Sequence, residues 1–335
     1  MVRAKVFVYD KRFDGLPKEG DLKLIEEELL PIKDGEFLAE ALYISVDPYM
    51  RYFAHILPIG STFVGQQIAV ITESKNPDYP VGKYIAACFG WRTHTISNGT
   101  TDLAFPTGVV PIIPLPDDEE IPKSLGLGVL GMPGNTAYFG FLELCQPKAG
   151  ETVVVTAAAG AVGSHVGQIA KIKGCIVIGI AGSDDKCNWL KNELNFDHVV
   201  NYKTQDIDKT LTEIAPQGVD CYFDNVGGEI SSIIIDHMNL NGRISVCGCI
   251  SGYDGKKQMS PNIQLPMIMK QLRMEGFIVY KWLDRWSEGI IQNWEWIKQG
   301  KLKYKEFVTN GFENTFKAFI QLLQGENVGK AIVKV

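Results

Sequence analysis

One stretch of the sequence, residues 151–194, limits the possible folds more than any other. Two continuous apolar runs, Glu151–Ala157 and Cys175–Ala181, have the length of buried strands, and the helical pattern of Ser164–Lys173 separates them. A second helical pattern, Asp184–Leu194, follows the second run. Buried strands that alternate with helices are typical of a parallel sheet with right-handed crossovers. The stretch therefore predicts an α/β fold with a doubly wound parallel sheet of the Rossmann type.

The two halves of the chain have different patterns. After residue 194 the alternation continues with the expected strands His198–Val200 and Val219–Asn225, the helix Ile230–Leu240 and the strand Gly242–Gly248. Before residue 120 the sequence instead consists of short β-forming runs divided by Gly and Pro, which is typical of a small barrel. A proline-rich, acidic join ends at Glu120. We therefore predict a β-rich domain over residues 1–120 and an α/β domain over residues 121–290.

Charge and cysteine usage exclude several classes of protein. The formal net charge is −6 with scattered Lys and Arg, which argues against a nucleic-acid partner or a polybasic membrane surface. No apolar run approaches the ~20 residues of a membrane span, and Met1–Asp10 lacks the apolar core of a leader peptide. Seven dispersed cysteines are typical of reduced thiols. We expect a cytoplasmic protein that binds neither nucleic acid nor membranes.

A glycine-containing turn, Ala158–Gly163, joins the first apolar strand to the first helix of the α/β domain. In this context several backbone N–H groups and the positive end of the helix point at one place, which suits a pyrophosphate. Gly160 would let the backbone approach the phosphate, and Gly163 would let the helix pack closely on the sheet. Ala158 replaces the first glycine of the G-x-G-x-x-G pattern. The turn thus indicates a dinucleotide site, with a tight turn that binds no ligand as the alternative.

The end of the second apolar strand bears on which dinucleotide is bound. NAD-dependent enzymes usually place Asp or Glu there to bind the ribose 2′-hydroxyl. This strand ends in the small residues Ala181-Gly182-Ser183, and Lys186 follows on the first helical turn. Asp184 and Asp185 fit a helix start better than a ribose contact. The pattern favours NADP(H), although Lys186 alone would also fit an ordinary solvated lysine.

Residue types needed for metal or nucleophile chemistry do not occur at suitable spacings. Cys88 is the only cysteine before Cys145, and Cys247 and Cys249 have no second pair at ligand spacing, so we expect no metal site. The histidines are isolated, and we expect His165 to have a structural role with its hydrogen bonds satisfied. No G-x-S-x-G elbow is present. Of the reaction classes considered, hydride transfer remains. In this class the cofactor supplies the chemistry and the protein supplies the geometry.

Motifs along the whole chain resemble the prostaglandin reductase and leukotriene B4 12-hydroxydehydrogenase family. The similarity extends to Asn327–Lys330, and its motifs are Val46–Arg51, Gly65–Gln67, Gly131–Tyr138, Ala157–Gly163, Asn201–Lys203, Tyr222–Gly228 and Arg273–Glu275. The resemblance implies a zinc-independent medium-chain dehydrogenase/reductase, with a GroES-like domain over residues 1–120 to which residues 291–335 return. It also implies a homodimer that reduces the C=C bond of lipid-derived α,β-unsaturated ketones and aldehydes with NADPH.

The same resemblance implies a set of site residues. Gly160, Ala161, Val162 and Gly163 would hold the diphosphate, and Lys186 and Tyr202 would contact the 2′-phosphate end of the cofactor. The remaining cofactor contacts would come from Asn225, Cys247, Gly248, Cys249, Ile250, Ser251, Gly252, Tyr253, Phe277, Ile278, Val279 and Asn327. Two segments that depart from the family pattern, 100–111 and 255–261, are expected to border the substrate entrance.

The implied reaction adds hydride to the β-carbon of an enone, so that charge develops on the carbonyl oxygen and a hydrogen-bond donor is needed there. The implied candidates are Tyr253, through the nicotinamide ribose, and Tyr49, through the substrate. A packed aromatic with no catalytic part is the alternative for each tyrosine. Leukotriene B4 12-hydroxydehydrogenase activity is a further implied function. A zinc-free quinone oxidoreductase and a non-catalytic, NADPH-binding structural protein remain alternative functions.

Overall fold

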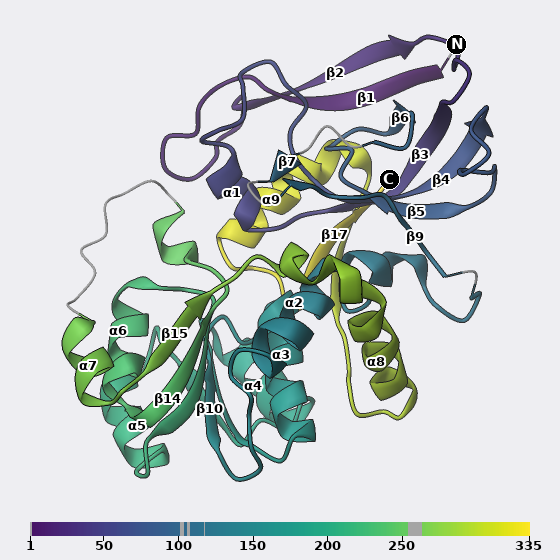
Figure 1. The fold of residues 1–335 in the computed structure, drawn as a ribbon. Coiled ribbons are helices and arrows are strands. Elements are labelled where there is room, and N and C mark those ends of the chain that lie inside the picture. The colour runs from purple at the N-terminus through teal and green to yellow at the C-terminus, as the bar shows by residue number, and fades with distance from the viewer. Residues whose placement is uncertain (1, 101–103, 106–107, 117, 254–262) are drawn as a thin grey trace. The chain divides into compact units, whose positions relative to one another are not determined.

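A computed structural model describes residues 2–100, 104–105, 108–116, 118–253 and 263–335 (Figure 1). The chain forms two compact units. The first unit contains residues 1–128, 306–327 and 331–335, and the second contains residues 129–305 and 328–330. The chain therefore returns to the first unit at residue 306 and contributes residues 328–330 to the second unit before it ends in the first. The functional roles expected for the ranges 1–120, 121–290 and 291–335 stay predictions.

The second unit is built on a six-stranded sheet whose neighbouring strands are all parallel. Its strands, in spatial order, are β12 (His198–Asn201), β11 (Ile176–Ala181), β10 (Thr152–Val155), β13 (Val219–Asp224), β14 (Met238–Val246) and β15 (Arg273–Gly276). Its α-helices are α2 (Met132–Leu142), α3 (Ala161–Ile172), α4 (Asp184–Asn192), α5 (Ile207–Ile214), α6 (Gly228–Asp236), α7 (Gln264–Met269) and α8 (Trp286–Lys298). Short 3₁₀ helices are η2 (Ile250–Gly252) and η3 (Val279–Arg285).

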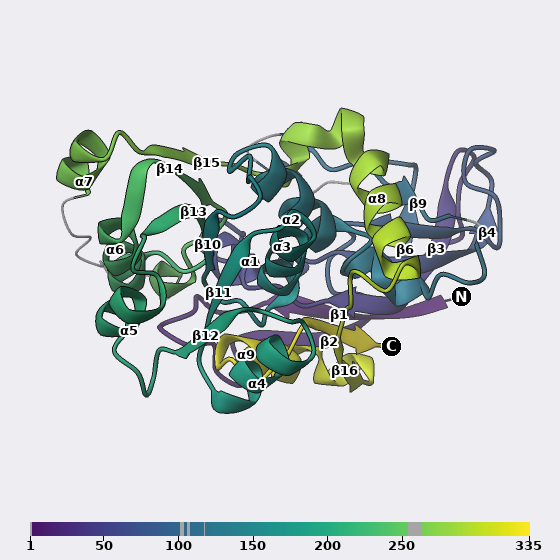
Figure 2. The same ribbon diagram turned by 90° about the horizontal axis from the view of Figure 1, so that it is seen from below.

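Both faces of this sheet are covered, which explains why its strands read as continuous apolar runs. Figure 2 shows α5 and α6 on one side of the sheet and α2 and α3 on the other. Successive side chains of a strand point to opposite faces. In β13, Tyr222 packs in the cluster formed with α5 and α6, and Phe223 contacts Phe141 of α2 on the other face. The predicted doubly wound parallel sheet is confirmed.

The first unit is rich in β-strands. A two-stranded hairpin joins β1 (Val2–Tyr9) and β2 (Leu22–Leu29). The larger sheet has the order β16 (Glu306–Asn310), β17 (Lys330–Lys334), β3 (Phe37–Ser45), β4 (Gln67–Ser74), β5 (Tyr84–Ala87) and β9 (Ile113–Pro114), and β6 (His94–Ser97) also pairs with β3. The remaining elements are β7 (Ala104–Phe105), β8 (Gly108–Val109), α1 (Tyr49–Phe53), α9 (Thr315–Leu323), η1 (Lys123–Leu127) and η4 (Phe312–Asn314).

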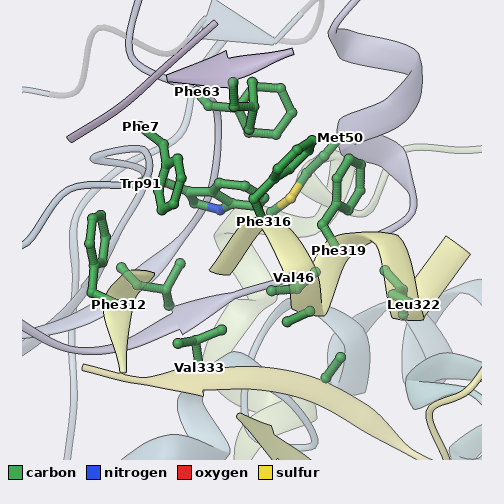
Figure 3. Close-up of a cluster of buried hydrophobic side chains, with 14 of the residues drawn as sticks. Phe7, Val46, Met50, Phe63, Trp91, Phe312, Phe316, Phe319, Leu322 and Val333 are labelled. Atoms are coloured by element: carbon green, nitrogen blue, oxygen red, sulfur yellow. The ribbon is translucent and has the colours of Figure 1, made fainter. Parts of the chain in front are cut away.

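An aromatic core holds this first unit together (Figure 3). Trp91 is fully buried, and its ring lies 4.6 Å from that of Phe63 and 5.7 Å from that of Phe319 on α9. Because α9 and β17 come from the end of the chain, residues more than 200 positions apart share one core. No helix among the described residues is long and apolar enough to span a membrane.

Candidate functional site

The parallel sheet has a point at which the direction of strand addition reverses. From β10 the chain proceeds to β11 and β12 on one side, and β13, β14 and β15 then add on the other side. In sheets of this kind, ligands bind outside the carboxyl ends of the strands at such a switch point. A ligand site is therefore expected at the loops that follow β10, β13 and β14.

The loop after β10 is a tight turn whose geometry requires small residues. A Cβ added to Gly163 would lie 2.5 Å from the carbonyl oxygen of Ala157 and 2.9 Å from Cα of Ala158, which only glycine avoids. The left-handed backbone conformation falls on Ala157, at φ 48°, and not on Ala158. This is why the position of the first glycine in the usual pattern tolerates alanine here.

Helix α3 begins at Ala161 rather than at the expected Ser164, directly after the N-cap residue Gly160. No side chain caps this end of the helix. The first N–H groups of a helix have no partner inside it, so those of Ala161, Val162 and Gly163 are directed beyond the helix end. Together with the helix dipole they form an arrangement suited to a phosphate.

A segment from the end of the chain lies beside this turn, and the sequence reasoning gave it no structural role. The N–H of Gly329 donates to the carbonyl oxygen of Ala159 at 2.8 Å, and Gly329 forms a parallel bridge with Gly160. Gly329 has φ 73°, and a Cβ there would lie 2.1 Å from the carbonyl oxygen of Lys305. Asn327, an expected cofactor contact, precedes this segment and belongs to the first unit.

The end of β11 carries the residues expected to select the 2′-phosphate. A Cβ at Gly182 would lie 2.9–3.1 Å from three atoms of the Tyr202 side chain, so Tyr202 lies directly against this glycine. Ser183 caps α4 by accepting the N–H of Lys186 at 3.4 Å, and Asp184 is in the first helical turn, as expected. Burial and the nearby charge of Lys203 lower the pKa of Lys186. Lys186 and Tyr202 thus lie in one region of the site.

The loop after β13 is held by a buried carboxylate. Asp224, which is 3% exposed, accepts the N–H groups of Val226 and Gly227 at 2.9 Å each and the hydroxyl of Ser231 at 2.7 Å. Asn225 is tied to the end of β10, since its side-chain amide donates to the carbonyl oxygen of Thr156 at 2.7 Å. These bonds fix the turn at the switch point. The resemblance pointed to Asn225 but not to the carboxylate that positions its loop.

The loop after β14 contains Tyr253. The N–H groups of Cys247 and Gly248 both donate to the backbone carbonyl of Asp224, which links this loop to the previous one. The hydroxyl of Tyr253 accepts the N–H of Cys249 at 3.2 Å and would be 3.2 Å from a Cβ at Gly248. The loop is closed by bonds from the N–H groups of Ile250 and Ser251 to the carbonyl oxygens of Asn225 and Val226.

The three residues expected from the end of β15 differ in their surroundings. The ring of Phe277 packs against Gly140, Phe223 and Trp282, so it belongs to the interior of the second unit. Ile278 is 39% exposed and Val279 is buried. A cofactor contact by Phe277 would therefore have to use its backbone.

Tyr49 is placed in the first unit, at the first position of α1. It is partly buried against the aromatic core, and its ring lies 5.7 Å from that of Phe53. Of the segments expected near the substrate entrance, residues 255–261 lie outside the described residues, and so does part of 100–111.

Two titratable side chains near these loops, Cys247 and His165, have pKa values that burial shifts toward their neutral forms. Desolvation raises the pKa of the Cys247 thiol to about 12 and lowers the pKa of His165 on α3 to about 4. The expectation that His165 is a satisfied structural histidine was wrong in one respect, because its buried Nδ1 has no hydrogen-bond partner. Within the described ranges, no three His, Cys, Asp or Glu side chains are grouped so that they could hold a metal ion.

Comparison with known proteins identifies the family. Residues 5–104 match the family described as N-terminal domain of oxidoreductase, and residues 161–296 match the one described as zinc-binding dehydrogenase. Prostaglandin reductase 1 of Bos taurus is 50% identical over 337 residues, which cover 100% of both chains. The chain belongs to the prostaglandin reductase 1 family. The family resemblance predicted from the motifs is confirmed.

More distant relatives of the prostaglandin reductase 1 family match over almost the same length. The NADPH-dependent curcumin reductase of Escherichia coli (strain K12) is 36% identical over 99% of this chain and 97% of its own. The crystal structure of CurA in complex with NADPH, from Vibrio vulnificus, superposes with a TM-score of 0.91 at 35% identity and covers 100% of this chain and 99% of its own. The fold is therefore that of the medium-chain dehydrogenases/reductases, with a Rossmann-type sheet and a β-rich unit.

Proposed function

We propose that the protein reduces the C=C bond of α,β-unsaturated ketones and aldehydes with NADPH, as 15-oxo-prostaglandin 13-reductases and 2-alkenal reductases do. The observation that carries this proposal is the 50% identity with prostaglandin reductase 1 over the whole chain. Curcumin, named in a second relative, also contains C=C bonds conjugated to a carbonyl. The substrate is therefore a small molecule with this bond, and we propose that it is lipid-derived.

The residues at the switch point fit a phosphorylated dinucleotide. The uncapped start of α3 presents backbone N–H groups, and Gly163 admits no side chain between the helix and the turn. Lys186 and Tyr202 provide a cation and an aromatic ring beside Gly182, where an NAD enzyme would usually place an acid. When bound, NADPH supplies the hydride, and the loops around Asn225 and Tyr253 orient the reacting partners.

Tyr253 is the proposed hydrogen-bond donor of the site: with NADPH bound, its hydroxyl would hold the nicotinamide ribose, and through it would stabilise the charge that develops on the substrate oxygen. Its own oxygen accepts the N–H of Cys249. An accepted hydrogen bond polarises a phenol and makes its O–H a stronger donor. Tyr49 is the proposed second hydrogen-bond donor, on the substrate side. The two tyrosines can be tested separately by single substitutions. The proton for the α-carbon comes from solvent or through a tyrosine.

We also propose a homodimer, as the family resemblance implies, and a cytosolic location. In the described part of the sheet β15 is an edge strand, paired only with β14. The α7 segment just before it exposes Leu265 (63%), Ile268 (71%) and Met269 (68%). An edge strand beside exposed apolar side chains suits pairing with a second copy. The seven cysteines, all of them among the described residues, are thiols outside any disulfide, which is consistent with a reducing compartment.

The dimer is tested by sedimentation of Ile268→Asp against Ile56→Asp, because Ile56 is an equally exposed isoleucine (65%) in the other unit. We expect only the first variant to become monomeric. Two dimeric variants would contradict the proposed interface.

The function is tested by following NADPH oxidation with a 2-alkenal, a 15-oxo-prostaglandin and a quinone in parallel. We expect turnover with the 2-alkenal and with the 15-oxo-prostaglandin, and recovery of the saturated carbonyl product from each. Turnover with the quinone alone would support the quinone oxidoreductase alternative. NADPH binding without turnover of any acceptor would support the non-catalytic alternative.

A further inference from the structure

The last residue of β12, Asn201, uses each of its polar groups to organise the turn that follows. Its side-chain amide donates to Asp184 Oδ1 at 2.7 Å, and its side-chain oxygen accepts the N–H of Lys203 at 3.1 Å. Its backbone N–H donates to Gln205 Oε1 at 2.8 Å. Asn201 is 5% exposed and pairs with Ala181 of β11. One buried side chain therefore joins the end of the sheet, the start of α4 and the turn that carries Lys203.

The hydrogen bonds of Asn201 influence the charged side chains near Gly182. Asp184 is the first acid after β11, close to the position at which an acid favours an unphosphorylated ribose. Its carboxylate accepts the Asn201 amide, whereas the backbone N–H of Lys186, two residues further along the same helix, is held by the Ser183 cap. The charge of Lys203 also acts on Lys186. Two cations thus share a region in which the Asp184 carboxylate is held by an amide.

The turn itself is restrained on its other side. Tyr202 lies between Asn201 and Lys203 in the chain, and its ring is packed against Gly182 at a distance that leaves no room for a Cβ. The backbone of Lys203 is therefore held by the Asn201 side chain, next to a Tyr202 whose ring is packed against Gly182.

We propose that Lys203 is a second cation for the 2′-phosphate and that Asn201 is a positioning residue that sets the preference for the phosphorylated cofactor. This inference rests on the proposed use of NADPH but not on the reduction of a C=C bond. A 2′-phosphate carries more than one negative charge, and two lysines with a restrained aromatic neighbour match it better than one lysine alone.

The test measures binding, so that it does not depend on turnover. Isothermal titration of the full chain with adenosine 2′,5′-bisphosphate and with AMP gives a selectivity ratio for the 2′-phosphate. We expect Lys203→Ala to lower this ratio at least tenfold by weakening the bisphosphate alone, and Lys203→Arg to retain most of it. Asn201→Ala should lower the ratio about as much, and Asn201→Asp should lower it further because it adds a negative charge.

Lys209→Ala is the matched control, since Lys209 is an exposed lysine in the same unit near the start of α5. Thermal unfolding of each variant checks that it is folded, and Lys203→Ala, at an exposed position, keeps the test decisive if Asn201→Ala unfolds. Ratios within twofold of the unmodified protein for Lys203→Ala would overturn the proposal. If the selectivity ratios of the variants fall as expected but the protein reduces no α,β-unsaturated carbonyl compound, the proposed function is refuted and this inference stands.

Discussion

Gly163 and Gly160 lie in the same turn, and we expect alanine to lower mainly the stability of the protein at position 163 and mainly its affinity for NADPH at position 160. A Cβ at position 163 would lie 2.5 Å from the Ala157 carbonyl oxygen, so the turn would have to move by about 0.9 Å to restore an ordinary contact of 3.4 Å. Ala157 cannot move freely, because it already has a left-handed backbone at φ 48°. At position 160 the corresponding distance is 3.2 Å, which needs a shift of only about 0.2 Å.

The magnitudes follow from these distances. Overpacking costs about 1–3 kcal/mol, and the gain in helix propensity from Gly to Ala offsets up to about 1 kcal/mol of this. We expect Gly163→Ala to lower the free energy of unfolding by about 1–2 kcal/mol, which corresponds to a fall in Tm of roughly 2–8 °C. Gly160→Ala should cost less than about 1 kcal/mol.

Cofactor affinity separates the two variants further. Gly160 directly precedes the uncapped N–H groups of α3, and a methyl group there obstructs a phosphate that approaches the backbone. We expect Gly160→Ala to raise the Kd for NADPH at least tenfold while leaving Tm nearly unchanged. Differential scanning fluorimetry and fluorescence titration measure the two quantities. An unchanged Tm for Gly163→Ala, or a larger loss of Tm for Gly160→Ala, would refute the reasoning.

Three further predictions concern single side chains. Tyr253→Phe should lower kcat by the equivalent of about 1–3 kcal/mol, and an unchanged kcat in steady-state assays would remove Tyr253 from the mechanism. Asp224→Asn should raise KM for NADPH and lower stability by about 2 kcal/mol or more, since a buried charged acceptor of several bonds is lost; a normal Tm in thermal unfolding would contradict this. His165 should destabilise the protein as pH falls, because its pKa is lowered from 6.5 to about 4 by burial and the unfolded state binds the proton first. The loss should reach about 3 kcal/mol between pH 6.5 and pH 4, and His165→Gln should flatten denaturant-derived stability over that window, whereas an equally steep profile would exclude His165 as the cause.

Local sequence patterns predicted the parallel sheet and the turn at Gly160 because the alternation of apolar strands with helices, and the glycines of the turn, are both visible in neighbouring residues. The boundary between α6 and β14 was predicted wrongly. We expected a helix over Ile230–Leu240, but α6 ends at Asp236 and β14 begins at Met238. Met238 pairs with Val219 of β13, and this pairing with a distant strand decides its conformation. Helical spacing of apolar residues cannot reveal such a partner.

Parts of the site that come from distant positions were beyond sequence reasoning for the same reason. Gly329 supports the turn at Gly160 from about 170 residues away, and nothing around it in the sequence marks that contact. Asn201 was visible only as a member of a family motif, and its bond to Asp184 depends on β12 lying beside β11. The same parallel pairing that makes the strands recognisable thus brings together polar residues whose joint role only the structure reveals. If charge near Gly182 were set by Lys186 alone, neither Asn201 nor Lys203 would affect selectivity, and the binding series distinguishes these two accounts directly.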